Sequence, residues 1–182
     1  TVLKGYLSLM RPANLPTAAA DIFAGAAIAG VFLETETFKF VFNLDLLLLV
    51  LASVLLYAGG VVLNDVFDIE IDKVERPERA IPSGLIPLKN ASVFGILLLC
   101  LGIILAFFVN TLSGTIATIL AACIISYDYY AKHKLILGPL NMGLCRGLNL
   151  VLGISVLGTI QHVEFTIIPI LYIAAITLIS KG

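Results

Sequence analysis

A dense group of acidic residues occupies positions 64–72, directly after a long apolar run. Asn64, Asp68 and Asp72 are spaced four residues apart, so on a continuing helix they share one face, with Asp65 at its edge. Carboxylate and amide oxygens suit a hard divalent cation, and Mg²⁺ is commonly held by one or two carboxylates together with substrate phosphates. These four residues form an acidic ladder that predicts a magnesium site. The alternative is a solvated acidic helix end.

Basic residues follow the acidic ladder on a segment that contains several prolines. Arg76 and Arg79 are interleaved with Pro77, Pro82 and Pro87, which preclude a regular helix and favour an ordered, extended loop. Guanidinium groups beside a metal site can bind phosphate oxygens through bidentate hydrogen bonds. The alternative is a basic loop without a ligand. The candidate phosphate-binding residues of the whole chain are Arg11, Arg76, Arg79, Lys132 and Lys134.

Further polar residues interrupt apolar stretches elsewhere. Asp21 and Asn14 fall on one helical stripe, and Arg146 and Asn149 fall on a second stripe with Asn141. An isolated carboxylate among apolar residues is unfavourable unless it is paired. For Asp21 we expect either a hydrogen bond to a polar substrate group or proton removal, and the alternative is a pairing that fixes helix packing. The second stripe is a candidate for substrate contacts.

The composition places these residues in a membrane protein. Of 182 residues, 60% are hydrophobic and 13% are charged, and the mean hydropathy is +1.08. A soluble domain could not cover so much apolar surface with so little polar surface. A net charge of −1 excludes a nucleic-acid partner bound through a basic face. The three cysteines lie in apolar runs at spacings that match no metal motif, which predicts buried side chains without a ligand.

Charge-free stretches delimit the expected membrane spans. Residues 91–127 carry no charge over 37 positions, and a single helix of that length would extend about 55 Å, well beyond a hydrocarbon core of about 30 Å. The chain must therefore turn, and residues 110–114 supply turn-forming side chains. We predict an all-α bundle with six spans, near residues 14–33, 46–63, 91–109, 113–130, 135–160 and 165–180.

The distribution of basic residues predicts the orientation. The N-terminal segment and loops 64–90 and 131–138 hold eight lysines and arginines, whereas the opposite side holds only Lys39. By the positive-inside rule, both termini and these two loops face the cytoplasm, or the stroma or matrix of an organelle.

The motifs resemble those of the UbiA superfamily of intramembrane prenyltransferases. Three stretches carry the resemblance: Asn64-Asp65-x-x-Asp68-x-x-x-Asp72 with Arg76-Pro77-x-Arg79, Arg11-Pro12-x-Asn14, and Tyr127 with Lys132-x-Lys134. Residues 141–149, together with Asp21, look most like the EboC-like branch of the superfamily.

This resemblance implies a bundle of nine spans around a central cavity, in which Mg²⁺ and a prenyl diphosphate bind and the prenyl group passes to an aromatic or other lipid-soluble acceptor. The second aspartate-rich motif would follow the sixth span, where this chain ends. We therefore expect residues 1–182 to be a single transmembrane domain, the N-terminal two-thirds of the family fold.

The resemblance also implies a role for each candidate residue. Tyr57 and Tyr127 could face the developing cation or hydrogen-bond a phosphate, and the alternative is that both belong to an interfacial aromatic belt. The expected metal ligands are Asn64, Asp65, Asp68 and Asp72; the expected substrate-binding residues are Arg11, Asn14, Arg76, Arg79, Lys132, Lys134, Arg146 and Asn149; the expected catalytic residues are Asp68, Asp72, Asp21 and Tyr127.

Three other functions compete with prenyl transfer. The first is a non-catalytic UbiA-like protein that acts in membrane assembly or as a carrier. The second is a CDP-alcohol phosphatidyltransferase, which the residues after Asp72 do not match. The third is a proton-coupled transporter that uses Asp21. The sequence identifies no protein partner.

Overall fold

The computed structural model describes residues 1–31, 44–130, 132, 134 and 136–180. Every regular element in these ranges is helical, which confirms the predicted all-α class. The elements are α1 (Val2–Leu9), η1 (Pro12–Asn14), α2 (Leu15–Ile28), α4 (Leu44–Phe67), α5 (Ile69–Glu75), α6 (Leu88–Val109), α7 (Thr111–Tyr129), α8 (Leu137–Ile154), η3 (Ser155–Leu157), η4 (Val163–Thr166) and α9 (Ile167–Ile179).

Among the described residues, four helical segments are long and apolar enough to cross a membrane: Leu44–Phe67, Leu88–Val109, Thr111–Tyr129 and Leu137–Leu157. A fifth apolar segment, Val163–Ile179, is shorter, and α2 has 14 residues. The predicted count of six spans therefore stays a prediction. Residues 32–43, which include Lys39, lie outside the described residues.

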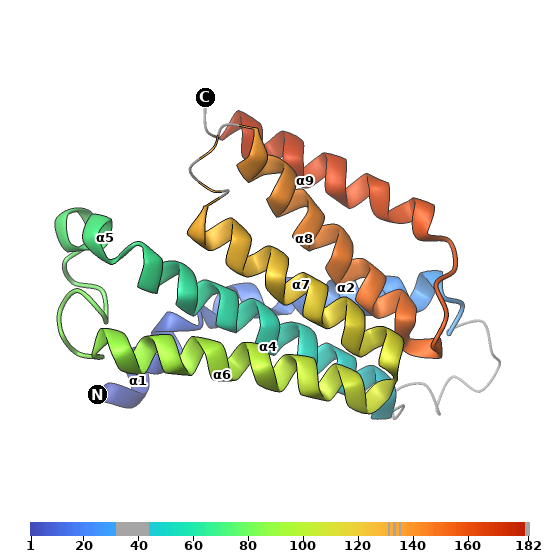
Figure 1. Ribbon diagram of the computed structural model, residues 1–182, viewed down its shortest axis with the longest axis horizontal. Helices are drawn as coiled ribbons and strands as arrows, with labels where there is room; N and C mark the ends of the chain where they lie inside the picture. Colours follow the sequence, from blue (N-terminus) through green and yellow to red (C-terminus); the bar gives the residue numbers. More distant parts are fainter. Residues whose placement is uncertain (32–43, 131, 133, 135, 181–182) are drawn as a thin grey trace.

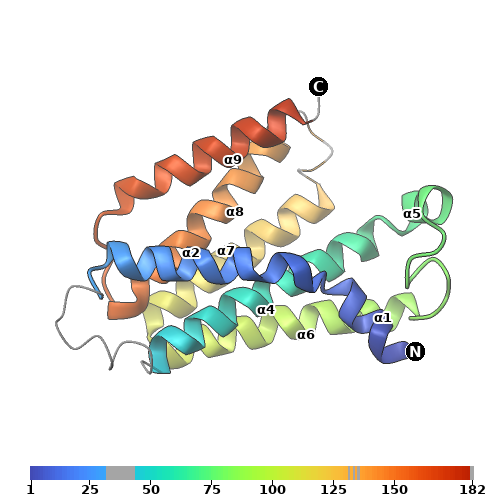
Figure 2. The same ribbon diagram turned by 180° about the vertical axis from the view of Figure 1, so that it is seen from behind.

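The long helices form a bundle in which neighbours in sequence are mostly neighbours in space (Figure 1). Helix α4 packs against α2, α6 and α7, and α8 packs against α2, α7 and α9. The reverse view in Figure 2 shows α2 running across the back of this bundle. The core is accordingly built from leucine, isoleucine and alanine side chains of α2, α4, α6, α7 and α8.

The turn between α6 and α7 is tighter than the sequence indicates. Instead of a loop over 110–114, Asn110 alone separates the two helices, with an extended backbone. Its side-chain oxygen accepts a hydrogen bond of 2.8 Å from the backbone N–H of Ser113. Asn110 therefore serves as the N-cap of α7, a position that favours asparagine because its side chain satisfies a free helix N–H.

Two glycines allow α2 and α8 to pack backbone to backbone. A Cβ atom on Gly25 would collide with the carbonyl oxygen of Leu150, and one on Gly153 would collide with that of Ile22. Small residues at such a crossing let membrane helices approach closely. This contact fixes the register that brings the polar residues of α2 next to those of α8.

The elements that carry the candidate site gather at one end of the bundle. Figures 1 and 2 show α1, α5 and the end of α7 at this end, and the turn between α6 and α7 at the other. The predicted common side of both termini and of loops 64–90 and 131–138 stays a prediction. The assignment of that side to the cytoplasm remains a prediction.

Candidate active site

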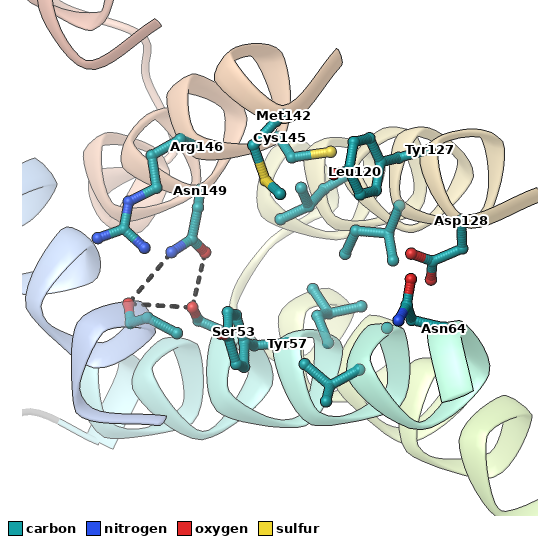
Figure 3. Close-up of a pocket in the computed structure, with 15 residues that line it drawn as sticks. Ser53, Tyr57, Asn64, Leu120, Tyr127, Asp128, Met142, Cys145, Arg146 and Asn149 are labelled. Atoms are coloured by element: carbon teal, nitrogen blue, oxygen red, sulfur yellow. Dashed lines mark hydrogen bonds between the residues drawn. The ribbon is translucent and has the colours of Figure 1, made fainter. Parts of the chain in front are cut away.

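A cavity of about 320 Å³ opens between α2, α4, α7 and α8 (Figure 3). Its lining runs along α4 from Ser53 to Asn64, a rise of about 16 Å at 1.5 Å per residue. Leu56, Leu120 and other apolar side chains form the middle of the lining. The cavity is therefore an elongated apolar chamber with polar groups at both ends.

The outer end of the cavity, called the mouth, carries a bridge between α4 and the chain after α7. The ammonium nitrogen of Lys132 lies 2.7 Å from Oδ1 of Asp68 and 3.0 Å from Oδ1 of Asn64, to which it donates a hydrogen bond. Asn64 Nδ2 also donates to Asp68 Oδ2 at 3.2 Å. Asn64 and Asp68 thus share a face, as their spacing predicts, although α4 ends at Phe67 and α5 begins at Ile69.

The other two ladder residues point elsewhere, so the expectation that Asp72 shares a face with Asn64 and Asp68, with Asp65 at its edge, is wrong. Asp65 accepts a hydrogen bond of 2.6 Å from Arg11, and Arg79 bridges Asp65 and Asp72 at 3.3 and 2.7 Å. Asp65 lies in α4 and Asp72 lies in α5, and the loop after α5 folds back to place one guanidinium between them. Arg11 is held here with a positive φ of 46°, a conformation that side chains rarely adopt without tertiary support.

Opposite charges stabilise one another in this second charged group, which consists of Arg11, Asp65, Asp72 and Arg79. Burial opposes the positive charge of Arg79, but its hydrogen bond to Asp72 and the negative charges of Asp65 and Asp72 outweigh burial and raise the pKa of the guanidinium. Asp65 and Asp72 are both buried. Arg79 therefore stays charged and neutralises two carboxylates that would otherwise be costly to bury.

The side-chain oxygens of Asn64 and Asp68 at the mouth are better placed to bind a magnesium ion than the four side chains of the acidic ladder together. Within the described residues, no group of three or more histidine, cysteine, aspartate or glutamate side chains is arranged as a metal site. However, the Oδ1 atoms of Asn64 and Asp68 converge on one cation, the ammonium of Lys132. An amide oxygen and a carboxylate oxygen that already share a positive charge are suitable ligands for Mg²⁺.

Of the expected substrate-binding residues, only Arg146 and Asn149 line this cavity, and three of the others contact residues outside its lining. Arg76 is exposed, and its Nη1 is 4.0 Å from Asp72. The ammonium of Lys134 lies 5.1 Å from the centre of the Tyr130 ring. Asn14 is exposed at the start of α2, where its backbone carbonyl accepts a hydrogen bond from Thr17.

The inner end of the cavity joins the two polar stripes expected from the sequence. Asp21 forms an ion pair of 3.1 Å with Arg146 and accepts a hydrogen bond of 3.0 Å from Asn149. Asn149 in turn accepts one of 2.6 Å from Ser53. These contacts agree with the packing role left open for Asp21, and Arg146 and Asn149 also line the cavity.

Three polar residues of the lining complete the site. Tyr57 and Tyr127 lie along the cavity wall, on α4 and α7. Asp128, which sequence reasoning missed, is 4% exposed and points into the mouth towards Asn64 (Figure 3). In the sequence it is one more acid beside a basic loop, and the signal that could have found it is its spacing of four residues from Lys132.

Comparison with known proteins settles the class. The model of the UbiA prenyltransferase family matches residues 22–180. The chain belongs to the UbiA prenyltransferase family. A solved structure described as digeranylgeranylglyceryl phosphate synthase in membranes superposes on this UbiA chain with a TM-score of 0.80 at 32% identity, covering 97% of this chain and 60% of the other. A UbiA homolog from Archaeoglobus fulgidus bound to DMAPP and Mg²⁺ shares the fold, with a TM-score of 0.74 at 16% identity, and covers 93% and 60%.

Curated relatives of this UbiA chain carry the same name as the first structure. Digeranylgeranylglyceryl phosphate synthase from Methanococcoides burtonii is 40% identical over 157 residues, which are 86% of this chain and 56% of the relative. The enzyme of that name from Sulfurisphaera tokodaii is 32% identical over 97% of this chain and 61% of its own. The chain thus spans less than two thirds of these relatives. The EboC-like assignment stays an untested prediction.

Proposed function

We propose that this chain is part of an intramembrane prenyltransferase that transfers a prenyl group from a prenyl diphosphate to a lipid-soluble acceptor. One observation carries the proposal: the cavity has an apolar interior and a mouth where Asn64 and Asp68 converge on a cation. A prenyl diphosphate has the same polarity, with an apolar tail and a charged head. Residues 1–182 would then form a single transmembrane domain of this enzyme.

In this proposal Mg²⁺ binds to Asn64 and Asp68, and when bound it stabilises negative charge on the diphosphate as a Lewis acid. Lys132, released from Asn64 and Asp68, would contact the phosphate oxygens directly. Arg11 and Arg79 present positive charge beside the mouth, and Asp65 and Asp72 hold them in position. Asp65 and Asp72 thus become positioning residues rather than metal ligands.

The apolar interior suits the bond exchange that prenyl transfer requires. The allylic C–O bond breaks with its electron pair on the departing diphosphate, and an acceptor atom forms the new bond to the same carbon. For a hydroxyl acceptor the new bond is an ether, and the hydroxyl proton passes to the departing diphosphate. Excluding water protects the allylic cation, and the rings of Tyr57 and Tyr127 in the cavity wall offer π-electrons to it.

The name of the relatives supports a proposal for the class of the acceptor. Their name, digeranylgeranylglyceryl phosphate synthase, describes a glyceryl phosphate with two geranylgeranyl groups. We therefore propose a geranylgeranyl diphosphate donor and a geranylgeranylglyceryl phosphate acceptor with a free hydroxyl. Both molecules have one anionic head and an apolar chain. The diphosphate head would stay at the mouth, which we place on the cytoplasmic side, while the apolar chains would enter the cavity.

The deciding experiment supplies the natural protein that contains this chain, in lipid vesicles, with labelled geranylgeranyl diphosphate, Mg²⁺ and one acceptor at a time. We expect ether formation with geranylgeranylglyceryl phosphate and none with 4-hydroxybenzoate. Transfer to the aromatic acceptor alone would overturn the acceptor class. Tight binding of the diphosphate without transfer to either acceptor would instead favour the non-catalytic carrier function.

A further inference from the structure

The carboxylate of Asp128 lies at the cavity mouth, on the helix that faces α4. It is 4% exposed, and its Oδ2 has no hydrogen-bond partner in the described part of the chain. Helix α7 positions it beside Tyr127, and both residues line the cavity with Asn64. A buried carboxylate oxygen without a hydrogen-bond donor is unfavourable, so packing alone does not explain the orientation of Oδ2 towards the mouth.

The oxygens of α4 point towards the same region. Figure 3 shows the side chains of Asn64 and Asp128 directed at one another across the mouth. Asn64 and Asp68 share the ammonium of Lys132, which follows Asp128 by four residues at the end of α7. Oxygens from both helices therefore lie around a position that already attracts positive charge.

We propose that Asp128 is a third protein ligand of the Mg²⁺ ion and joins Asn64 and Asp68 across the mouth. The proposal rests on the proposed function, which places Mg²⁺ at this mouth. One amide oxygen and two carboxylates leave positions for water and diphosphate oxygens, which is how proteins usually hold Mg²⁺. With Asp128 included, the ion links α4 to α7, and the ammonium of Lys132 moves towards the diphosphate.

A direct consequence is that the metal stabilises the fold through Asp128. Without metal, Asp128→Asn removes a buried charge and keeps the side-chain shape, so the variant should unfold at the same temperature as the wild type or higher. With metal, the wild type gains stability by binding, and Asp128→Asn should lose most of that gain. The two unfolding temperatures, with and without Mg²⁺, therefore separate a ligand from a packing residue.

The affinity test uses Mn²⁺ as a spectroscopic probe, titrated into the full-length protein in detergent and followed by electron paramagnetic resonance. We expect Asn64→Ala, Asp68→Asn and Asp128→Asn each to weaken Mn²⁺ binding by about tenfold or more. The matched control is Glu70→Gln, which removes an acid nearby whose side chain is 79% exposed and pairs with Lys73. It should change the affinity by no more than about twofold.

Each outcome of this titration decides between the two proposals. If Asp128→Asn binds Mn²⁺ as tightly as the wild type while Asn64→Ala and Asp68→Asn do not, the inference is wrong and the proposed function stands. If none of the three substitutions changes the affinity for Mn²⁺, the proposed magnesium site is wrong, and the result contradicts both proposals.

A second variant keeps the inference testable if Asp128→Asn does not fold. Asp128→Cys replaces a carboxylate by a thiol, which as thiolate prefers softer metals. We expect it to bind Cd²⁺ with a thiolate charge-transfer absorption that the wild type, with Cys145 in the same cavity, does not show. Cd²⁺ binding without that absorption would overturn the inference.

Discussion

Lys132 and Asp68 lie 2.7 Å apart, from Nζ to Oδ1, and join the chain after α7 to the junction between α4 and α5. The same ammonium donates to Asn64. A cation of the protein therefore occupies the position between two oxygens that suit Mg²⁺. In the proposed function, binding of the metal would require this lysine to move, and the diphosphate bound with the metal would offer it new oxygens.

Substitution of Lys132 should consequently have opposite effects on the two ligands. In Lys132→Met the competing charge is absent, so Mn²⁺ alone should bind several-fold more tightly than in the wild type. A prenyl diphosphate analogue with a non-reactive linkage should bind about tenfold more weakly, because a charge-assisted hydrogen bond is lost. Calorimetric titration of each ligand measures both effects. Weakening of both ligands would show that Lys132 does not compete for the metal position.

Arg79 and Arg76 form a matched pair for a stability test. Arg79 bridges two buried aspartates, whereas the side chain of Arg76 is 53% exposed and 4.0 Å from Asp72. Arg79→Met should lower the free energy of unfolding by roughly 2–3 kcal/mol, because it leaves Asp72 without its closest partner and Asp65 with Arg11 alone. Arg76→Met should change it by less than about 0.5 kcal/mol. Detergent-induced unfolding measures both, and equal losses would contradict the bridge.

The fold was largely predictable because the thickness of the bilayer limits the length of each apolar helix. The uncharged stretch over residues 91–127 is too long for one span, and the structure divides it at Asn110 into α6 and α7. The exact turn was less predictable, since asparagine, threonine, serine and glycine all occur between 110 and 114 and only the N-cap contact with Ser113 selects one position. The length of α2 was overestimated for a similar reason: apolar residues continue beyond the helix end at Ile28.

The candidate site was predictable in its residue types and less so in its pairings. Helical spacing placed Asn64 and Asp68 together correctly. It could not show that Arg79 would return from a loop to bridge Asp65 and Asp72, because a contact across an irregular loop depends on tertiary packing. Asp128 was missed because its residue type does not distinguish it from a solvated acid, whereas its burial in the structure does.

Asp21 should affect the acceptor more than the diphosphate. It pairs with Arg146 and Asn149 at the inner end of the cavity, far from the bridge at Lys132. Asp21→Asn should therefore leave the affinity for a prenyl diphosphate analogue within about threefold of the wild type. The rate of transfer to the acceptor should fall further, since the loss concerns the other substrate or its positioning. Equal weakening of diphosphate binding by Asp21→Asn and Asn64→Ala would place Asp21 in the diphosphate site.

The orientation of the bundle can be tested with single cysteines in a background without the natural ones. Arg76 lies in the loop after α5, and His162 lies in the exposed segment before η4. A membrane-impermeant maleimide should label Arg76→Cys only from the cytoplasmic side and His162→Cys only from the other. Labelling of both from one side would refute the topology and the position of the mouth together.

The central claim, that the cavity mouth binds the diphosphate through Mg²⁺, is tested most directly by one comparison. The affinity of the full-length protein for a non-reactive prenyl diphosphate analogue is measured with Mg²⁺ and with EDTA, in the wild type, in Asp68→Asn and in the control Glu70→Gln. We predict that Mg²⁺ strengthens binding to the wild type and to Glu70→Gln by about 10²-fold or more, and that Asp68→Asn loses nearly all of this gain. If Asp68→Asn keeps the full effect of Mg²⁺, Asp68 does not hold the metal and the account is wrong.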